Sequence, residues 1–206
     1  MDTAQAAEHW DSAYTEGDRT RSWFQTEPTE SLRMFDACGV TSADSVIDVG
    51  GGASTLVDAL LARGFAELTV LDVSAAGLRA AQARLGSKAD RVCWIEADLL
   101  RWYPERRYQV WHDRAVLHFL TAEPDRQRYL NTLGAATVPG ALAVFATFAA
   151  DGPQQCSGLP VARYSAEDLA QLLGEEWATV ADDREDHVTP AGVVQPFVWA
   201  GFRRMA

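Results

Sequence analysis

The chain has 206 residues, of which 48% are hydrophobic, and its formal net charge is −11 at pH 7. This length and apolar content suit one domain with its own core and leave no room for a separate substrate domain. A strongly acidic surface repels a phosphate backbone, so we expect no nucleic-acid partner. The three cysteines, Cys38, Cys93 and Cys156, are too widely spaced for a disulfide framework or a zinc site, and we predict no bound metal.

The sequence contains no evident targeting or membrane segment. Residues 1–8 lack both the basic start and the apolar run of a signal peptide. The longest apolar stretch, residues 141–150, is too short to cross a bilayer. We therefore expect a soluble, cytoplasmic protein without a membrane partner.

The first 40 residues are rich in aromatic side chains and are predicted to be largely helical. Residues 9–14 are typical of the start of a helix, and residues 29–38 predict a second one. Trp23 and Phe24 lie between them, in a loop that could cover a bound ligand. The alternative is that these side chains and Trp10 only pack the helices onto the rest of the domain. We favour a covering role for Trp23.

A nucleotide-type binding loop is predicted after the first strand. The apolar run 46–49 is followed by three glycines and by an amphipathic helix over residues 56–61, so the backbone can approach a ligand closely. The glycines are Gly50, Gly51 and Gly52. A dinucleotide fingerprint would need another glycine where the chain has Thr55. Asp48 beside the loop would repel a pyrophosphate and attract an ammonium group, which favours a cationic ligand over NAD.

Two further strands are predicted to lead into carboxylates. The apolar run 68–72 ends at Asp72, which precedes Val73 and stands 22 positions after Gly50. This is the spacing of an acid that accepts hydrogen bonds from ribose hydroxyls. A third strand, residues 92–95, leads to Asp98 and Leu99. Asp98 can accept from an adenine amino group, and the Leu99 backbone N–H can reach the ring.

A fourth strand, residues 108–111, leads into His112, Asp113 and Arg114. The carboxyl ends of parallel strands meet at one edge of an open α/β sheet, which is where such sheets bind ligands. A glycine turn or an acid after a strand is common by itself. Four such signals in order predict one binding site for an adenosine-containing ligand.

The C-terminal half continues the alternation of strands and helices. A helix is predicted to begin at Thr121 or Pro124 and to end near residues 139–140. Ser165 and Asp168 are typical of a capping box before another helix. Residues 177–188 and 193–203 are predicted to be two strands of a terminal hairpin.

Over nearly its whole length the chain resembles the class I S-adenosylmethionine-dependent methyltransferases. The matching motifs are residues 48–52, Asp72, residues 96–99, residues 114–120 and the turn at residues 139–140. The resemblance implies an α/β, Rossmann-like seven-stranded sheet with helices on both faces and a C-terminal antiparallel hairpin. It implies a single domain, with an N-terminal helical lid or substrate segment in residues 1–40 and a cofactor-binding core in residues 41–206. Ser54 stands where many members carry a third glycine.

The resemblance implies S-adenosyl-L-methionine as the cofactor. The residues expected to bind it are Asp48, Gly50, Gly51, Gly52, Asp72, Val73, Asp98, Leu99, Asp113 and Trp23. Trp23 would cover the sulfonium, because a cation over an indole face gains about 0.5–2 kcal/mol.

Methyl transfer needs a general base only when the acceptor is protonated at the working pH. His112, Asp113 and His118 are the candidates, because they follow the fourth strand and should face the methyl group. Asp113 could instead contact the cofactor or cap a helix, and His118 could be a packed residue. Holding the acceptor in line at near-contact distance can supply most of the acceleration without a base.

The loop at residues 151–164 follows the fifth strand, and in this family it borders the acceptor pocket. Cys156, Arg163 and Tyr164 are the candidate substrate residues there. Arg163 could pair with a carboxylate and Cys156 could offer a thiol to a soft metalloid. Alternatively, Cys156 is an inert small residue and Arg163 a surface charge.

We expect transfer of a methyl group to a small-molecule acceptor by in-line displacement. The alternative is a protein lysine methyltransferase, whose aromatic N-terminal segment is broadly similar. Those enzymes carry a Lys-Gly-Thr-type segment after the fourth strand, where this chain has Arg114-Ala115-Val116. A third possibility is a non-catalytic partner subunit that only binds the cofactor.

Overall fold

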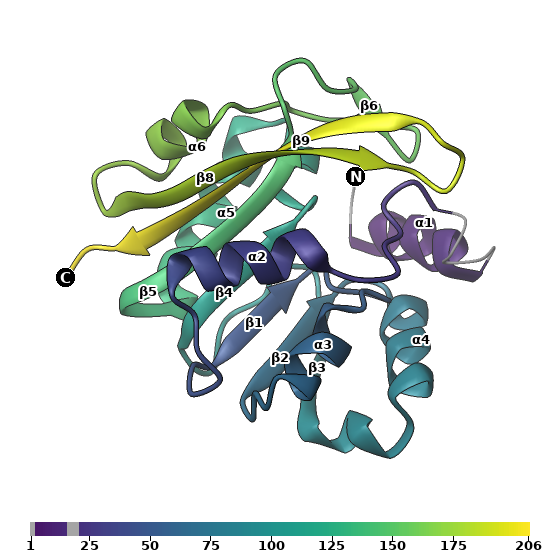
Figure 1. The fold of residues 1–206 in the computed structure, drawn as a ribbon. Coiled ribbons are helices and arrows are strands. Elements are labelled where there is room, and N and C mark those ends of the chain that lie inside the picture. Colours follow the sequence, from purple (N-terminus) through teal and green to yellow (C-terminus); the bar gives the residue numbers. More distant parts are fainter. Residues whose placement is uncertain (1–2, 16–20) are drawn as a thin grey trace.

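The computed structural model describes residues 3–15 and 21–206. A seven-stranded sheet runs through it in the order β3-β2-β1-β4-β5-β9-β8 (Figure 1). Its strands are β1 (Val46–Val49), β2 (Leu68–Asp72), β3 (Val92–Glu96), β4 (Tyr108–Arg114), β5 (Thr137–Phe148), β8 (Trp177–Val188) and β9 (Val194–Arg204). A separate small hairpin is formed by β6 (Gln155–Cys156) and β7 (Leu159–Pro160).

The strand directions confirm the predicted fold class. β1 is parallel to β2 and β4, β2 is parallel to β3, and β4 is parallel to β5. β9 is antiparallel to both β5 and β8, which gives the C-terminal hairpin of a class I methyltransferase sheet. The carboxyl ends of β1 to β4 therefore meet at one edge of the sheet, as the sequence predicts.

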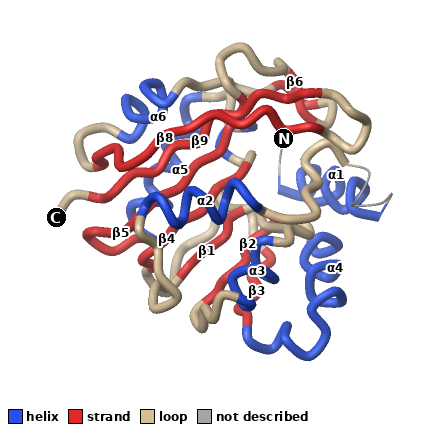
Figure 2. Tube along the Cα trace, viewed as in Figure 1, coloured by secondary structure: helices blue, strands red, loops and turns tan. Residues whose placement is uncertain are grey.

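Helices cover both faces of the sheet, as Figure 2 shows. On one face lie α2 (Thr29–Cys38), α3 (Leu56–Ala62) and α4 (Ala75–Leu85), and on the other lie α5 (Glu123–Ala136) and α6 (Ala166–Leu173). Each face has its own hydrophobic cluster, because side chains alternate along a strand. In β4, Val110 packs into the first cluster and Trp111 into the second. Helix α1 (Thr3–Thr15) lies beside α4 (Figure 1).

Most predicted elements are confirmed, and the differences lie at their ends. The prediction for α2 is correct at both ends, and Ser165 and Asp168 form the predicted capping box of α6. β4 ends at Arg114, so His112, Asp113 and Arg114 form its last three residues, as predicted. α5 ends at Ala136, so the predicted helix end near residues 139–140 is wrong, because these residues already belong to β5.

None of the helices within residues 3–15 and 21–206 has the length and apolar character that crossing a bilayer requires.

Candidate active site

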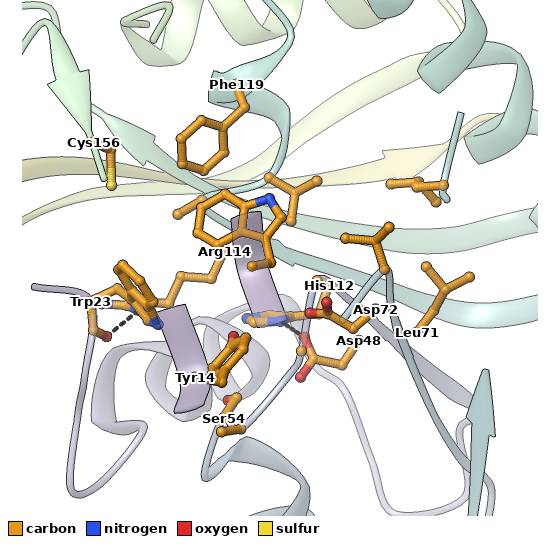
Figure 3. Close-up of a pocket in the computed structure, with 18 of the residues that line it drawn as sticks. Tyr14, Trp23, Asp48, Ser54, Leu71, Asp72, His112, Arg114, Phe119 and Cys156 are labelled. Carbon is orange, nitrogen blue, oxygen red and sulfur yellow. Dashed lines mark hydrogen bonds and ion pairs between the residues drawn. The ribbon is translucent and has the colours of Figure 1, made fainter. Parts of the chain in front are cut away.

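A cavity of about 300 Å³ opens at the carboxyl ends of β1 to β4. It extends from Asp72, Asp98 and Leu99 on one side to Trp23, Phe119 and Cys156 on the other, and Figure 3 shows the labelled members of this lining. Of the predicted cofactor residues, Asp48, Gly50, Gly51, Asp72, Val73, Asp98, Leu99 and Trp23 line it. Gly52 and Asp113 do not.

The glycine loop after β1 needs glycine for conformation and for space. Gly50 has φ +64° and Gly52 has φ +40°, which are values that residues with a Cβ rarely adopt. A Cβ on Gly50 would overlap the side chain of Val116, and one on Gly51 would lie 2.6 Å from an oxygen of Asp48. Ser54 does not have a positive φ, so the substitution of the family's third glycine requires no backbone strain.

Asp48 is buried at the end of β1 and is held by His112. The Nδ1 of His112 lies 2.7 Å from Oδ1 of Asp48, and its Nε2 lies 3.1 Å from the Ser31 hydroxyl of α2. The other carboxylate oxygen, Oδ2, is buried and has no partner among the described residues. Asp48 and His112 both line the cavity, so this oxygen can accept from a ligand ammonium group.

Asp72 is a buried carboxylate at the end of β2. Its Oδ1 accepts from the Ser74 backbone N–H at 2.7 Å, and the Gly52 N–H also bonds to the carboxylate. Burial raises the pKa of Asp72 to about 7, although these backbone hydrogen bonds oppose the shift. Ribose hydroxyls would supply further donors to the ionised form.

Asp98 and Leu99 follow β3 and line the far end of the cavity. Asp98 Oδ1 accepts from the Leu100 N–H at 3.0 Å, and its Oδ2 accepts from the Thr3 hydroxyl at 2.5 Å. Thr3 is the first residue of α1. The start of this helix therefore contacts the carboxylate that was predicted to accept from adenine.

Helix α1, residues 21–28 and the turn after β4 contribute the aromatic side chains of a wall over the cavity. Trp10 contacts both Trp23 and Phe119 edge to face, with ring centroids 5.8 Å and 5.1 Å apart. Asp11 fixes α1 to the start of α4, because its Oδ1 accepts from the Ser74 hydroxyl at 2.6 Å and from the Ala76 backbone N–H at 2.9 Å. Helix α2 also lies within the predicted lid of residues 1–40, but unlike α1 it packs on the face of the sheet.

Asp113 faces the opposite side of the sheet, contrary to the expectation that it borders the methyl group. Its carboxylate accepts from the Tyr129 hydroxyl of α5 at 2.5 Å and from the backbone N–H groups of Val116 and Leu117. Burial raises its pKa to about 6. Asp113 and His112 are consecutive residues of β4, so their side chains lie on opposite faces. Asp113 therefore caps the turn after the strand.

His118 also lies outside the cavity lining. Its ring packs against Phe119 and Phe148, with centroids 4.4 Å and 4.9 Å away, and it is fully buried. Neither ring nitrogen has a partner within residues 3–15 and 21–206. Burial, with a contribution from Arg114, lowers the pKa of His118 to about 3. This is the packed alternative considered for this residue, and a base of such a low pKa is a weak one.

The three candidate substrate residues are not brought together. Cys156 lines the cavity, but burial raises the pKa of its thiol, which keeps it protonated. Arg163 is exposed and donates to the Gly152 carbonyl at 3.2 Å. Tyr164 is buried in the hydrophobic cluster on the α5 and α6 face. Arg163 and Tyr164 therefore lie outside the cavity, contrary to expectation, because residue 164 bridges to Ala149 and fixes the loop against β5.

Residues 46–140 match the family model described as a methyltransferase domain. This segment is a methyltransferase domain. Together with the sheet order, the match confirms the prediction of a class I S-adenosylmethionine-dependent methyltransferase. A comparison with curated proteins finds no match.

Solved structures of low sequence identity share the fold of this methyltransferase. One describes the conversion of a disulfide bond into a thioacetal group during echinomycin biosynthesis, with TM-score 0.76, 21% identity and coverage of 97% of this chain and 93% of that one. Another is 1,6-didemethyltoxoflavin-N1-methyltransferase from Burkholderia thailandensis, with TM-score 0.70, 19% identity and coverage of 100% and 92%. The N-methyltransferase NodS from Bradyrhizobium japonicum, with S-adenosyl-L-homocysteine, has TM-score 0.70, 17% identity and coverage of 95% and 98%.

The cavity of the methyltransferase fits S-adenosylmethionine, the cofactor of this class. The unpartnered oxygen of Asp48 suits the cofactor's ammonium group, and Gly50 and Gly51 line the cavity beside it. Asp72 and Asp98 suit the ribose and the adenine amino group. Within the described part of the chain, no three His, Cys, Asp or Glu side chains gather as a metal site would require.

Sequence reasoning missed Tyr14 as a residue of the methyltransferase cavity. Tyr14 lies over Gly52, where a Cβ would overlap its hydroxyl group, and the Asp72 charge helps to raise its pKa. The signal was present in the sequence, because Ala6, Trp10 and Tyr14 are spaced four residues apart. That spacing places them on one face of a helix, and all three line the cavity.

Proposed function

We propose that the chain transfers a methyl group from S-adenosylmethionine to a small-molecule acceptor by in-line displacement. The observation that carries this proposal is the aromatic wall of Trp10, Trp23 and Phe119, which encloses the part of the cavity beyond Asp48. When bound, S-adenosylmethionine supplies an electrophilic methyl group on a sulfonium. The enclosing aromatic side chains exclude water and favour a cation.

The proposed roles follow from the position of each side chain. Asp48 receives the ammonium group of the cofactor and is oriented by His112. Asp72 and Val73 hold the ribose, and Asp98 and Leu99 hold the adenine. The backbone of the glycine loop contacts the cofactor directly. Helix α1 and residues 21–28 act as the lid.

We propose that in-line positioning, rather than a general base, gives most of the acceleration. Both ring nitrogens of His112 already have partners, Asp113 faces α5, and His118 is neutral and packed between phenylalanines. No candidate base therefore offers a free atom to the cavity. The acceptor must then be nucleophilic without help from these three side chains.

One protein of the same fold, the 1,6-didemethyltoxoflavin-N1-methyltransferase with bound 1,6-didemethyltoxoflavin, supports a small acceptor by analogy. Another protein of this fold is the glycopeptide N-methyltransferase MtfA.

The test is incubation of the protein with methyl-labelled S-adenosylmethionine and either dialysed lysate or the small-molecule fraction of the same lysate. We expect label in the small-molecule fraction. Label confined to protein would replace the proposal with a protein methyltransferase. Tight binding of S-adenosyl-L-homocysteine with no label in either fraction would favour a cofactor-binding subunit without catalysis.

A further inference from the structure

Arg114 presents an unused donor edge beside the cavity. It is the last residue of β4, and its Nη1 donates to the backbone carbonyl of Trp23 at 2.9 Å. Its Nε and Nη2 are buried and have no partner among the residues that the structure describes. These two nitrogens form one edge of the guanidinium, with parallel N–H bonds that match the two oxygens of a carboxylate.

This edge remains free although a carboxylate lies nearby. Glu185 of β8 acts electrostatically on Arg114, but no ion pair within 4 Å joins them in the described chain. Oε1 of Glu185 accepts from Gln25 at 3.0 Å and Oε2 accepts from Trp199 at 2.8 Å. Arg114 rests over the ring of Phe197, 5.3 Å from its centroid, which supports the cation but satisfies no N–H group. A buried guanidinium with two unmade hydrogen bonds is costly, and such a site favours an anionic ligand.

The position of Arg114 separates it from the carboxylates that suit the ribose and the adenine of the cofactor. Asp72 ends β2 and Asp98 follows β3, whereas Arg114 lies on the β4 and β9 side of the cavity. Asp48, which suits the ammonium group, acts electrostatically on Arg114. Figure 3 shows Trp23 and Cys156 to one side of Arg114, and Asp72 to the other. Among the described residues that line the cavity, Arg114 is the only arginine or lysine.

Arg114 lies on the same face of the sheet as His112, because the two residues are two positions apart in β4, and both line the cavity. Ala115 has φ +69°, an uncommon value for a residue other than glycine. The Asp113 carboxylate holds the next turn by accepting from the Val116 and Leu117 N–H groups. A strained backbone maintained by its surroundings is common at binding sites.

We infer that Arg114 recognises the acceptor, and that the acceptor is a small aromatic acid whose carboxylate pairs with the Nε and Nη2 of Arg114. The aromatic part follows from Trp10, Trp23 and Phe119, which line the same part of the cavity. This inference rests on the proposed function and names the chemical class of its substrate.

The test uses matched acids and amides, because the acceptor itself is unidentified. Protein saturated with S-adenosyl-L-homocysteine is titrated in a calorimeter with benzoate and benzamide, phenylacetate and phenylacetamide, and indole-3-acetate and indole-3-acetamide. In at least one pair the acid should bind about tenfold or more tightly than the amide. The preference should fall to about onefold in Arg114→Met and to an intermediate value in Arg114→Lys, which keeps the charge but loses the paired donors.

Arg163→Met is the matched control, because Arg163 is exposed and lies outside the cavity lining. It should keep the full preference for the acid. The inference is overturned if no acid is preferred in the wild-type protein, or if the preference persists in Arg114→Met. It is also overturned if Arg114→Met weakens the binding of S-adenosyl-L-homocysteine about tenfold, because Arg114 would then serve the cofactor. Failure of wild-type protein to bind S-adenosyl-L-homocysteine would instead contradict the proposed function, and that binding also reports that each variant is folded.

Discussion

The Nδ1 of His112 lies 2.7 Å from Oδ1 of Asp48, and the two residues are register partners on neighbouring parallel strands. The contact joins the end of β4 to the end of β1 beneath the cavity. It uses one oxygen of Asp48 and leaves the other buried and unpartnered. His112 is therefore placed to orient the acid that we propose for the ammonium group.

We predict that His112→Leu weakens S-adenosylmethionine binding about 10- to 100-fold, because Asp48 loses its fixed orientation and a charge-assisted hydrogen bond. His112→Asn should recover much of the affinity, since its amide can still donate to Asp48. Calorimetric titration of the folded variants measures both effects. If His112→Leu keeps full affinity and loses only turnover, His112 is a base and the positioning role is wrong.

We predict that cofactor binding weakens as the pH falls below about 7. The pKa of Asp72 is raised to about 7, so lowering the pH through this value protonates the carboxylate that should accept from the ribose. Affinity should fall up to about tenfold per pH unit below the pKa, and binding near pH 7 should release a proton. Titration with 5′-methylthioadenosine isolates the effect, because this ligand carries the ribose but no titrating amino-acid group.

Asp72→Asn should bind 5′-methylthioadenosine weakly at every pH from 5.5 to 8.5, with a flat profile. Asp36→Asn provides a control, because Asp36 is an exposed acid paired with Arg63 on the surface. It should keep the wild-type profile. A flat profile in the wild-type protein would remove Asp72 from the ribose role or show that it is ionised throughout this range.

The positions of Asp48, Asp72 and Asp98 at one edge of the sheet could be predicted from the sequence. Asp48 lies near the end of the first apolar run, Asp72 ends the second and Asp98 comes shortly after the third, and the parallel topology brings such positions together whatever the details of packing. Trp23 was also predicted to border the ligand, and it lines the cavity. These inferences needed only local patterns and their order along the chain.

The orientations of Asp113 and Arg114 could not be predicted in this way. The sequence places His112 and Asp113 together at the end of the fourth strand and indicates that both face the methyl group. Both residues lie within β4, which ends at Arg114, so the alternation of side chains along the strand puts them on opposite faces. The positive φ of Ala115 depends on tertiary contacts and has no local sequence signal.

His118 should make the fold sensitive to acid. Its pKa is about 3 in the folded protein and about 6.5 when unfolded, so the unfolded chain binds one more proton as the pH falls between these values. Stability is fully present above pH 6.5 and is lost by about 1.4 kcal/mol per pH unit below it. Between pH 7.5 and 5.0, wild-type protein should therefore lose about 2 kcal/mol more unfolding free energy than His118→Phe.

Urea unfolding at the two pH values measures this difference. His118→Gln should show the same reduced pH dependence as His118→Phe, because neither replacement can take up a proton in this range. Equal losses in wild-type protein and both variants would show that His118 is protonated in the folded state at pH 5. In that case the residue would again be a candidate base.

The last prediction separates the two reasons for glycine at position 50. Gly50→Ala meets both an unfavourable positive φ and an overlap with the Val116 side chain. Gly64→Ala is the matched control, because Gly64 has φ +88° with no atom within 4 Å of an added Cβ. Gly64→Ala should cost only the conformational part, about 1–2 kcal/mol of unfolding free energy, and Gly50→Ala should cost more.

The double variant Gly50→Ala with Val116→Ala tests the overlap directly, because truncation of Val116 removes the overlapping methyl groups. In urea unfolding, the loss of unfolding free energy in the double variant should be smaller than the sum of the losses in the two single variants. Simple additivity would show that the loop moves away from Val116, and the close packing of the glycine loop against the turn after β4 would then not be required for its shape.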